Sequence, residues 1–223
     1  MNSLSVSHAV HFVHDLEAVR TQLHHFGLKL YTNNERSLPG TQSALTEFSF
    51  PHIKFLSITE KTAASKSFLG KEALTFLPVK QILGHLVLET DDLNGLRKRL
   101  FEKGHELTLI STADEAEPLY AIPGSLNGLA YPLIQKKKTV TTPKIHHTLK
   151  EIHIRVDNPK YVLKYWAELF NLQVIHNSLF FDDIAVNFTK GSANRLHALV
   201  FDATSNVISQ TEFRIGEGFY RFR

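Results

Sequence analysis

The sequence contains no cysteine among its 223 residues, which excludes disulfide bonds, thiolate metal ligands and cysteine nucleophiles. No apolar run approaches the ~18 residues that a membrane-spanning helix requires. Residues 1–8 are polar and lack the apolar segment of a signal peptide. These absences predict a cytoplasmic protein without a membrane segment.

An excess of charge of one sign is also missing. Lysine and arginine number 25 against 22 aspartates and glutamates, a net charge of +3 that is too small to indicate a nucleic-acid-binding protein. The basic run Lys136 to Lys138 is interpreted as part of a solvated linker, and it alone supports a nucleic-acid-associated or structural role. The 13 histidines, in contrast, favour metal or acid–base chemistry.

An internal repeat organises the chain. A shift of 77 residues aligns several identical pairs without a gap, among them His8 with His85, Asp15 with Asp92, and Gly27 with Gly104. Each copy predicts a strand, a helix capped by the aspartate and a glycine at the helix end. In the first copy, further strands are expected at 28–32, 43–50 and 52–58. A third, weaker copy begins near Glu151, with Asn158 as the cap and Pro159 in the first helical turn.

The repeat predicts an α+β protein built from βαβββ modules, about three complete and a partial fourth. Paired modules are expected over residues 1–136: module 1 at about 5–60, a partly helical insertion at 61–81 and module 2 at about 82–136. Residues 137–148 would be a linker in which His146 and His147 are exposed. Residues 149–223 would hold the third module and extra strands at 195–202 and 213–222.

Several segments resemble a known family. They are HAVHFVHDLEAVRTQLHHFGLKL (8–30), PGTQSAL (39–45), PHIKFLSITE (51–60), LAYPLIQKK (129–137) and FRIGEGFYRFR (213–223). In their order and spacing they resemble the glyoxalase-like group of the vicinal-oxygen-chelate superfamily. The resemblance implies curved mixed sheets with helices packed outside. It also implies that modules 1 and 2 pair and enclose a cleft. In catalytic relatives a divalent metal is held there by side chains from the first and last strand of each module.

Strand alternation predicts which side chains line this cleft, because every second side chain lies on the same face. The resemblance places His8 in the cleft, the repeat places His85 at the equivalent position, and His11 would then face the helix layer. The full candidate set is His8, Val10, Phe12, His52, Lys54, His85, Val87 and Gln135. No catalytic residue is predicted.

The candidate set is an incomplete version of the family's metal site. His8 and His85 could bind zinc, nickel, iron or manganese, or each imidazole could make one structural hydrogen bond. Lys54 opposes a metal, because a divalent cation ~4 Å from its ammonium group would be repelled by roughly 8 kcal/mol at an effective dielectric near 20. Lys54 could instead anchor a carboxylate or phosphate, or extend to solvent along the strand.

Three functions therefore stay open. The first is a glyoxalase-like protein that binds a small anionic ligand, without a metal or other cofactor, between modules 1 and 2. The second is a metal-dependent lyase, isomerase or dioxygenase of the vicinal-oxygen-chelate type. The third is the structural or nucleic-acid-associated role. Whether the protein is an enzyme is not decided by the sequence. An odd module leaves exposed strand edges that a homodimer would cover.

Overall fold

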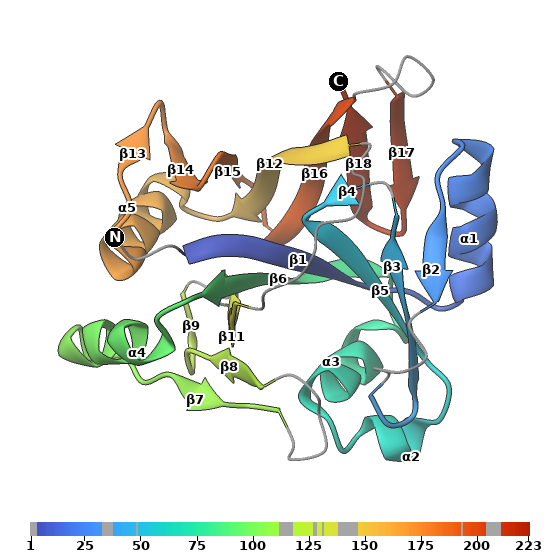
Figure 1. Cartoon of the computed structure of the whole chain (residues 1–223), viewed down its shortest axis with the longest axis horizontal. Coiled ribbons are helices and arrows are strands. Elements are labelled where there is room, and N and C mark those ends of the chain that lie inside the picture. The colour runs from blue at the N-terminus through green and yellow to red at the C-terminus, as the bar shows by residue number, and fades with distance from the viewer. Residues whose placement is uncertain are drawn as a thin grey trace.

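The computed structural model describes residues 4–32, 38–47, 49–111, 118–126, 129–130, 132–137, 147–192, 194–203 and 211–223. Two sheets dominate the fold (Figure 1). The first sheet contains β1 (Leu4–Phe12), β2 (Leu30–Thr32), β3 (Thr41–Thr46), β5 (His52–Ile58), β6 (Ile82–Thr90), β7 (Thr108–Leu109), β8 (Leu119–Ala121) and β11 (Leu133–Lys136). The second contains β4 (Ser49–Phe50), β12 (His147–Val156), β13 (Val174–Ile175), β14 (Ser178–Phe181), β15 (Ile184–Lys190), β16 (Arg195–Ala203), β17 (Thr211–Ile215) and β18 (Gly218–Phe222).

The remaining elements are short strands and helices. β9 (Ser125–Leu126) and β10 (Leu129–Ala130) form a two-stranded sheet. The helices are α1 (Leu16–His25), α2 (Lys61–Ala64), α3 (Phe68–Phe76), α4 (Leu93–Glu102) and α5 (Pro159–Phe170). No helix in the described part of the chain combines the length and the apolar character needed to cross a membrane.

The strand order confirms the modular fold. In the first sheet the order β2-β3-β5-β1-β6-β11-β8-β7 joins two βαβββ modules through the antiparallel pair β1 and β6. In the second sheet β13-β14-β15-β12, with α5, is a third module. The strands β16, β18 and β17 continue that sheet as a fourth module, whose described residues include no helix.

The expected helix boundaries are confirmed. The side chains of Asp15, Asp92 and Asn158 accept hydrogen bonds from backbone N–H groups in the first turns of α1, α4 and α5, which satisfies donors that have no partner inside the helix. Gly27 and Gly104 follow α1 and α4 with φ of 70° and 80°. Glycine adopts this left-handed conformation without a steric penalty, so it ends the helix.

Several boundaries differ from the prediction. The expected strand over 43–50 is two strands, because β3 ends at Thr46 and β4 pairs with β12 of the second sheet. The expected strand over 213–222 is two strands, β17 and β18, because the chain turns at Gly216, where φ is 53°. The expected linker at 137–148 ends earlier, because β12 begins at His147. His147 is buried rather than exposed, since its ring packs edge-on against Phe222 with centroids 5.3 Å apart. Residues 138–146, including His146, lie outside the described residues.

The larger core lies between the two sheets. Phe55 and Leu86 of the first sheet and Ile152 and Phe201 of the second contribute to it from the faces that we call the inter-sheet faces. α1 closes this core at one end of the molecule, and α4 and α5 lie at the opposite end (Figure 1). Trp166 of α5, 1% exposed, belongs to this core, as its helical position predicts.

His11 also belongs to the larger core, which corrects its predicted place against the helix layer. The helices cover the ends of the inter-sheet face, whereas the second sheet covers the region where His11 lies. The ring stacks between Phe55 and Tyr220, with centroid distances of 5.4 and 5.9 Å. The Tyr220 hydroxyl also forms a hydrogen bond with Nδ1 of His11.

A smaller core lies on the opposite face of the first sheet, which we call its outer face. Leu69 and Ala73 of α3, with Leu77, pack there on Phe12 and Leu56. The insertion at 61–81 thus supplies a helix that covers one end of the face at which the cleft was expected.

Candidate functional site

The eight predicted cleft residues share the outer face of the first sheet. Val10, Phe12 and Val87 belong to its smaller core, and strand pairing places the polar members beside them. His8 is the cross-strand neighbour of His52. Val10 lies between Lys54 on β5 and His85 on β6. The structure therefore brings the two imidazoles to the same face, on adjacent strands.

His85 lies at the end of this face that α3 covers. The side chain is 5% exposed, and its ring contacts those of Phe12 and Phe68 at centroid distances of 5.9 and 5.7 Å. Its Nε2 lies 3.5 Å from a carboxylate oxygen of Glu72 on α3. His85 is thus surrounded by the insertion, and Glu72 is a neighbour that strand alternation cannot reveal.

The other end of the outer face is polar. Gln135 donates a hydrogen bond of 2.8 Å to the hydroxyl of Ser7, and that hydroxyl lies 3.1 Å from Nδ1 of His8. Burial raises the pKa of Glu89, which lies nearby on β6. Sequence reasoning missed both Ser7 and Glu89. Alternation along β6 could have identified Glu89, two residues after Val87, whereas Ser7 lies at a bulge of β1.

The charge of Lys54 shapes the polar end. Burial, Lys54 and the neighbouring His52 together lower the pKa of His8 to about 3. At neutral pH the His8 imidazole is therefore uncharged and offers one donor and one acceptor. Lys54 itself is half-buried and carries three donors. The arrangement combines a cationic donor with neutral hydrogen-bonding groups.

This donor set does not fit a divalent metal. Among the described residues, no three His, Asp or Glu side chains come close enough together to hold a metal ion. The carboxylate nearest to His85 belongs to α3, and His8 experiences the positive charge of Lys54. A cation bound to His8 would be repelled by that ammonium group.

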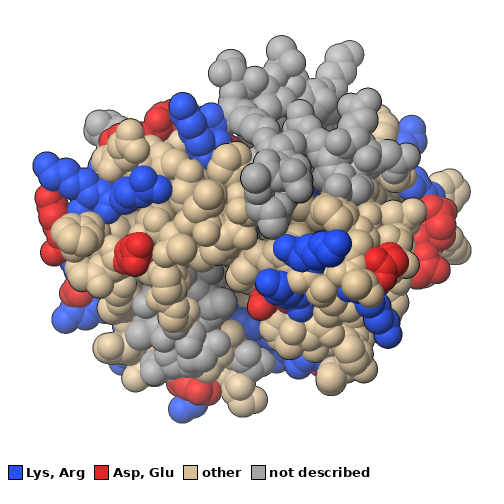
Figure 2. Space-filling model, turned by 90° about the horizontal axis from the view of Figure 1, so that it is seen from below, with Lys and Arg blue, Asp and Glu red and all other residues tan. Residues whose placement is uncertain are grey.

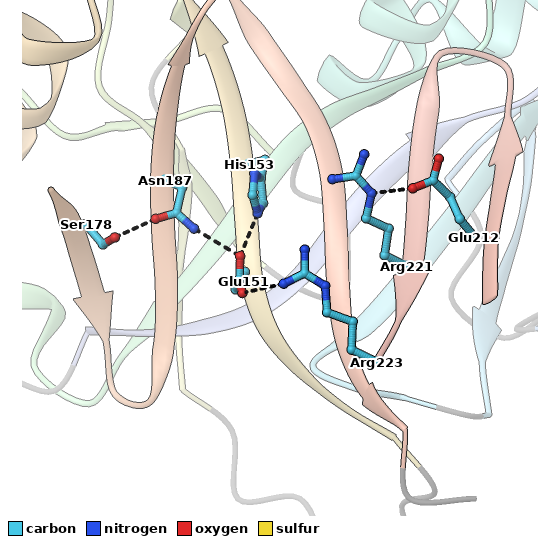
Figure 3. A network of polar contacts seen from close by, with 7 residues as sticks. All are labelled: Glu151, His153, Ser178, Asn187, Glu212, Arg221 and Arg223. Carbon is cyan, nitrogen blue, oxygen red and sulfur yellow. Dashed lines mark hydrogen bonds and ion pairs between the residues drawn. The ribbon is translucent and has the colours of Figure 1, made fainter. Parts of the chain in front are cut away.

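The second sheet presents another polar face, which sequence reasoning did not identify as a site (Figure 3). Its centre is Glu151 on β12, whose carboxylate lies 2.7 Å from Nε2 of His153 and 3.3 Å from the guanidinium of Arg223. Asn187 donates to the same carboxylate at 3.3 Å, and Ser178 donates to Asn187. The third copy of the repeat could have indicated this site, because it aligns Glu151 with His8.

Charges are mixed on the side of the molecule that lies at the bottom of Figure 1. Figure 2 shows that Lys and Arg alternate there with Asp and Glu and are separated by uncharged side chains. The described surface of this side shows no broad patch of positive charge. A nucleic acid is bound through such a patch, so this side gives a nucleic-acid-associated role no support.

Comparison with known proteins agrees with the modular fold. The sequence model of the glyoxalase-like domain family matches residues 6–170. A hypothetical protein from Staphylococcus aureus has a similar structure, with a TM-score of 0.81, 15% identity and coverage of 99% of this chain and 98% of that chain.

Two further structures show the same fold at lower similarity. A mutant 4-hydroxymandelate synthase from Streptomyces coelicolor has a TM-score of 0.60 at 10% identity and covers 91% of this chain and 72% of its own. The Mn(II)-bound glyoxalase from Novosphingobium aromaticivorans has a TM-score of 0.55 at 12% identity, with coverage of 92% and 68%. No protein with a curated description matches the sequence. From the family match and the shared architecture, the chain belongs to the glyoxalase-like domain family of the vicinal-oxygen-chelate superfamily.

Proposed function

We propose that the protein binds a small anionic molecule, without a metal, at the polar end of the outer face of the first sheet. The observation that carries the proposal is the position of Lys54 beside a neutral His8, whose pKa its charge helps to lower to about 3. A carboxylate or phosphate would form a charge-assisted hydrogen bond with Lys54. His8, being uncharged, can donate or accept without adding a repulsive charge.

The surrounding side chains limit what the ligand can be. α3 covers the apolar end of the face, so the ligand extends from Lys54 toward Ser7 and Gln135. These two residues provide neutral hydrogen-bonding groups. Glu89 bounds the site on that side and would repel a second negative charge. The proposed ligand is therefore a small molecule with one anionic end and one polar, uncharged end.

A metal-dependent lyase, isomerase or dioxygenase is the alternative that the family suggests. One relative is described as a Mn(II)-bound glyoxalase. In this chain, Lys54 opposes a cation beside His8, and His85 already contacts Glu72 of the insertion. We therefore favour metal-independent binding. A cytoplasmic location and a homodimer stay predictions.

The proposal can be tested by isothermal titration calorimetry with acetate, benzoate and inorganic phosphate as probes. We expect at least one anion to bind the parent protein, and Lys54→Gln to weaken that binding by about tenfold or more, because a hydrogen bond to a charged group contributes ~1.5–3 kcal/mol. Lys54→Arg keeps the charge and should retain more affinity. Lys66→Gln, which neutralises an exposed lysine between α2 and α3, is the matched control and should bind like the parent.

Two results would contradict the proposal. One is a Lys54→Gln variant that binds every anion as tightly as the parent. The other is stoichiometric zinc, nickel, iron or manganese in protein purified without a chelator or an affinity tag. If His8→Ala combined with His85→Ala removed that metal, the metal-dependent alternative would replace the proposal.

A further inference from the structure

The two sheets share the same strand register, so positions in one can be matched to positions in the other. The central antiparallel pair of each sheet, β1 with β6 and β12 with β16, shifts register at two equivalent places. On this match, Glu151 is equivalent to His8, Arg155 to Phe12 and Arg195 to Ile82. The face of the second sheet that carries Arg155 therefore corresponds to the outer face of the first, and we call it the outer face of the second sheet.

The matched ends of the two outer faces have opposite character. In the first sheet, Phe12 and Ile82 belong to the apolar core that α3 covers. That helix comes from the connection between β5 and β6. The equivalent connection in the second sheet, between β15 and β16, is only residues 191–194, less than the length of two helical turns. It therefore supplies no helix, and at the matched positions the second sheet has two arginines.

These two arginines lie directly opposite each other across β12 and β16. Like charges in this position repel and destabilise the strand pair. Arg195 forms an ion pair with Glu217, which also lies 3.6 Å from the ammonium of Lys80. Arg155 is exposed, and no carboxylate in the described part of the chain forms an ion pair with it. Positive charge thus remains uncompensated at this end of the face.

A third arginine and a histidine complete the cluster. His197 lies on β16 with its ring 4.7 Å from that of Phe219, centroid to centroid. Its pKa is lowered to about 4 by burial and by the charges of Arg155, Arg221 and Arg195. Three guanidinium groups therefore act on one imidazole. Arg221 is also paired with Glu212 (Figure 3).

We propose that Arg155, Arg195 and Arg221, grouped around His197, form a second site that binds a small polyanion with phosphate or paired carboxylate groups. The planar guanidinium group can donate two parallel hydrogen bonds to either kind of anion. A bound polyanion would also remove the repulsion between the opposed arginines. The carboxylate of Glu151, four residues before Arg155 on β12, forms an ion pair with Arg223 (Figure 3).

The test is an NMR titration of the full chain with inorganic pyrophosphate and with citrate, monitored at the ring of His197. Sodium chloride at matched ionic strength controls for screening. We expect a saturable shift with at least one polyanion, and a loss of affinity of about tenfold or more in Arg155→Gln. This substitution of an exposed side chain should preserve the fold. Arg155→Lys keeps the charge but loses the planar guanidinium group, so its affinity should be intermediate.

Two control variants separate this site from the one on the first sheet. Arg97→Gln changes an exposed arginine of α4, and Lys54→Gln changes the proposed anchor of the other site. Both should bind the polyanion at His197 like the parent. A shift that sodium chloride reproduces, or an affinity unchanged by Arg155→Gln, would overturn the inference. Loss of polyanion binding in Lys54→Gln alone would also overturn it, and would assign the anion to the first sheet.

Discussion

His11 should make the stability of the protein depend on pH, because it is held neutral between the two sheets. Burial lowers its pKa from 6.5 to about 3. Burial also raises the pKa of Tyr220 well above its usual value, and the Tyr220 hydroxyl forms a hydrogen bond with Nδ1 of His11. A proton added to the His11 ring would place an uncompensated charge in the core between the two sheets.

The direction and the size of the effect follow from these pKa values. In the unfolded chain His11 takes up a proton near pH 6.5, whereas in the folded protein it stays neutral down to about pH 3. The unfolded state therefore binds more protons in this interval, and the free energy of unfolding falls as the pH falls through it. Between pH 7.5 and pH 5.0 this residue alone should lower the free energy of unfolding by about 2 kcal/mol.

Urea unfolding of the parent and of His11→Gln at both pH values measures this contribution. The variant should be less stable at each pH, because the stacking of the ring is lost. Its difference in unfolding free energy between pH 7.5 and 5.0 should nevertheless be smaller than that of the parent by about 2 kcal/mol. His24→Gln, on the exposed side of α1, should leave the difference unchanged. A His11→Gln variant with the full pH dependence of the parent would refute the reasoning.

Four further substitutions test the packing of the helices and turns on the sheets. Gly40→Ala should lower the melting temperature more than Gly27→Ala: both glycines have positive φ, but the added Cβ at Gly40 would lie 2.2 Å from a backbone oxygen, and at Gly27 it would meet nothing within 4 Å. Equal effects would contradict this. Leu69→Ala should cost about 2–5 kcal/mol in urea unfolding if α3 packs on the first sheet as described. Trp166→Ala should cost about 3–5 kcal/mol by the same measurement, and a value below 1 would show that α5 is not part of the core.

Much of the fold could be predicted because its signals are local. Asp15 and Asp92 cap their helices through backbone N–H groups only two or three residues away. Gly27 and Gly104 end the same helices through their own backbone conformation. The repeat of these short-range signals at a constant offset was enough to indicate the modules.

The candidate site could be predicted only in part. Alternation correctly assigned His8 and Lys54 to one face, because successive side chains along a strand point to opposite faces of the sheet. It failed for Ser7, which lies at a bulge. It also placed His11 against helices, because the packing of the third module and the C-terminal strands on the first two modules was not predicted. The contact between Glu72 and His85 depends on how the insertion folds back onto the sheet.

By itself, the sequence determined the modules, the helix ends and which side chains of a strand share a face. Each of these depends on residues close together in the chain. Only the tertiary structure decided what covers each face: the second sheet over His11, and α3 over Phe12. It also decided that Arg155 and Arg195 oppose each other, because strand register and bulges arise from the pairing of segments far apart in the sequence. The charge of both proposed sites depends on that pairing.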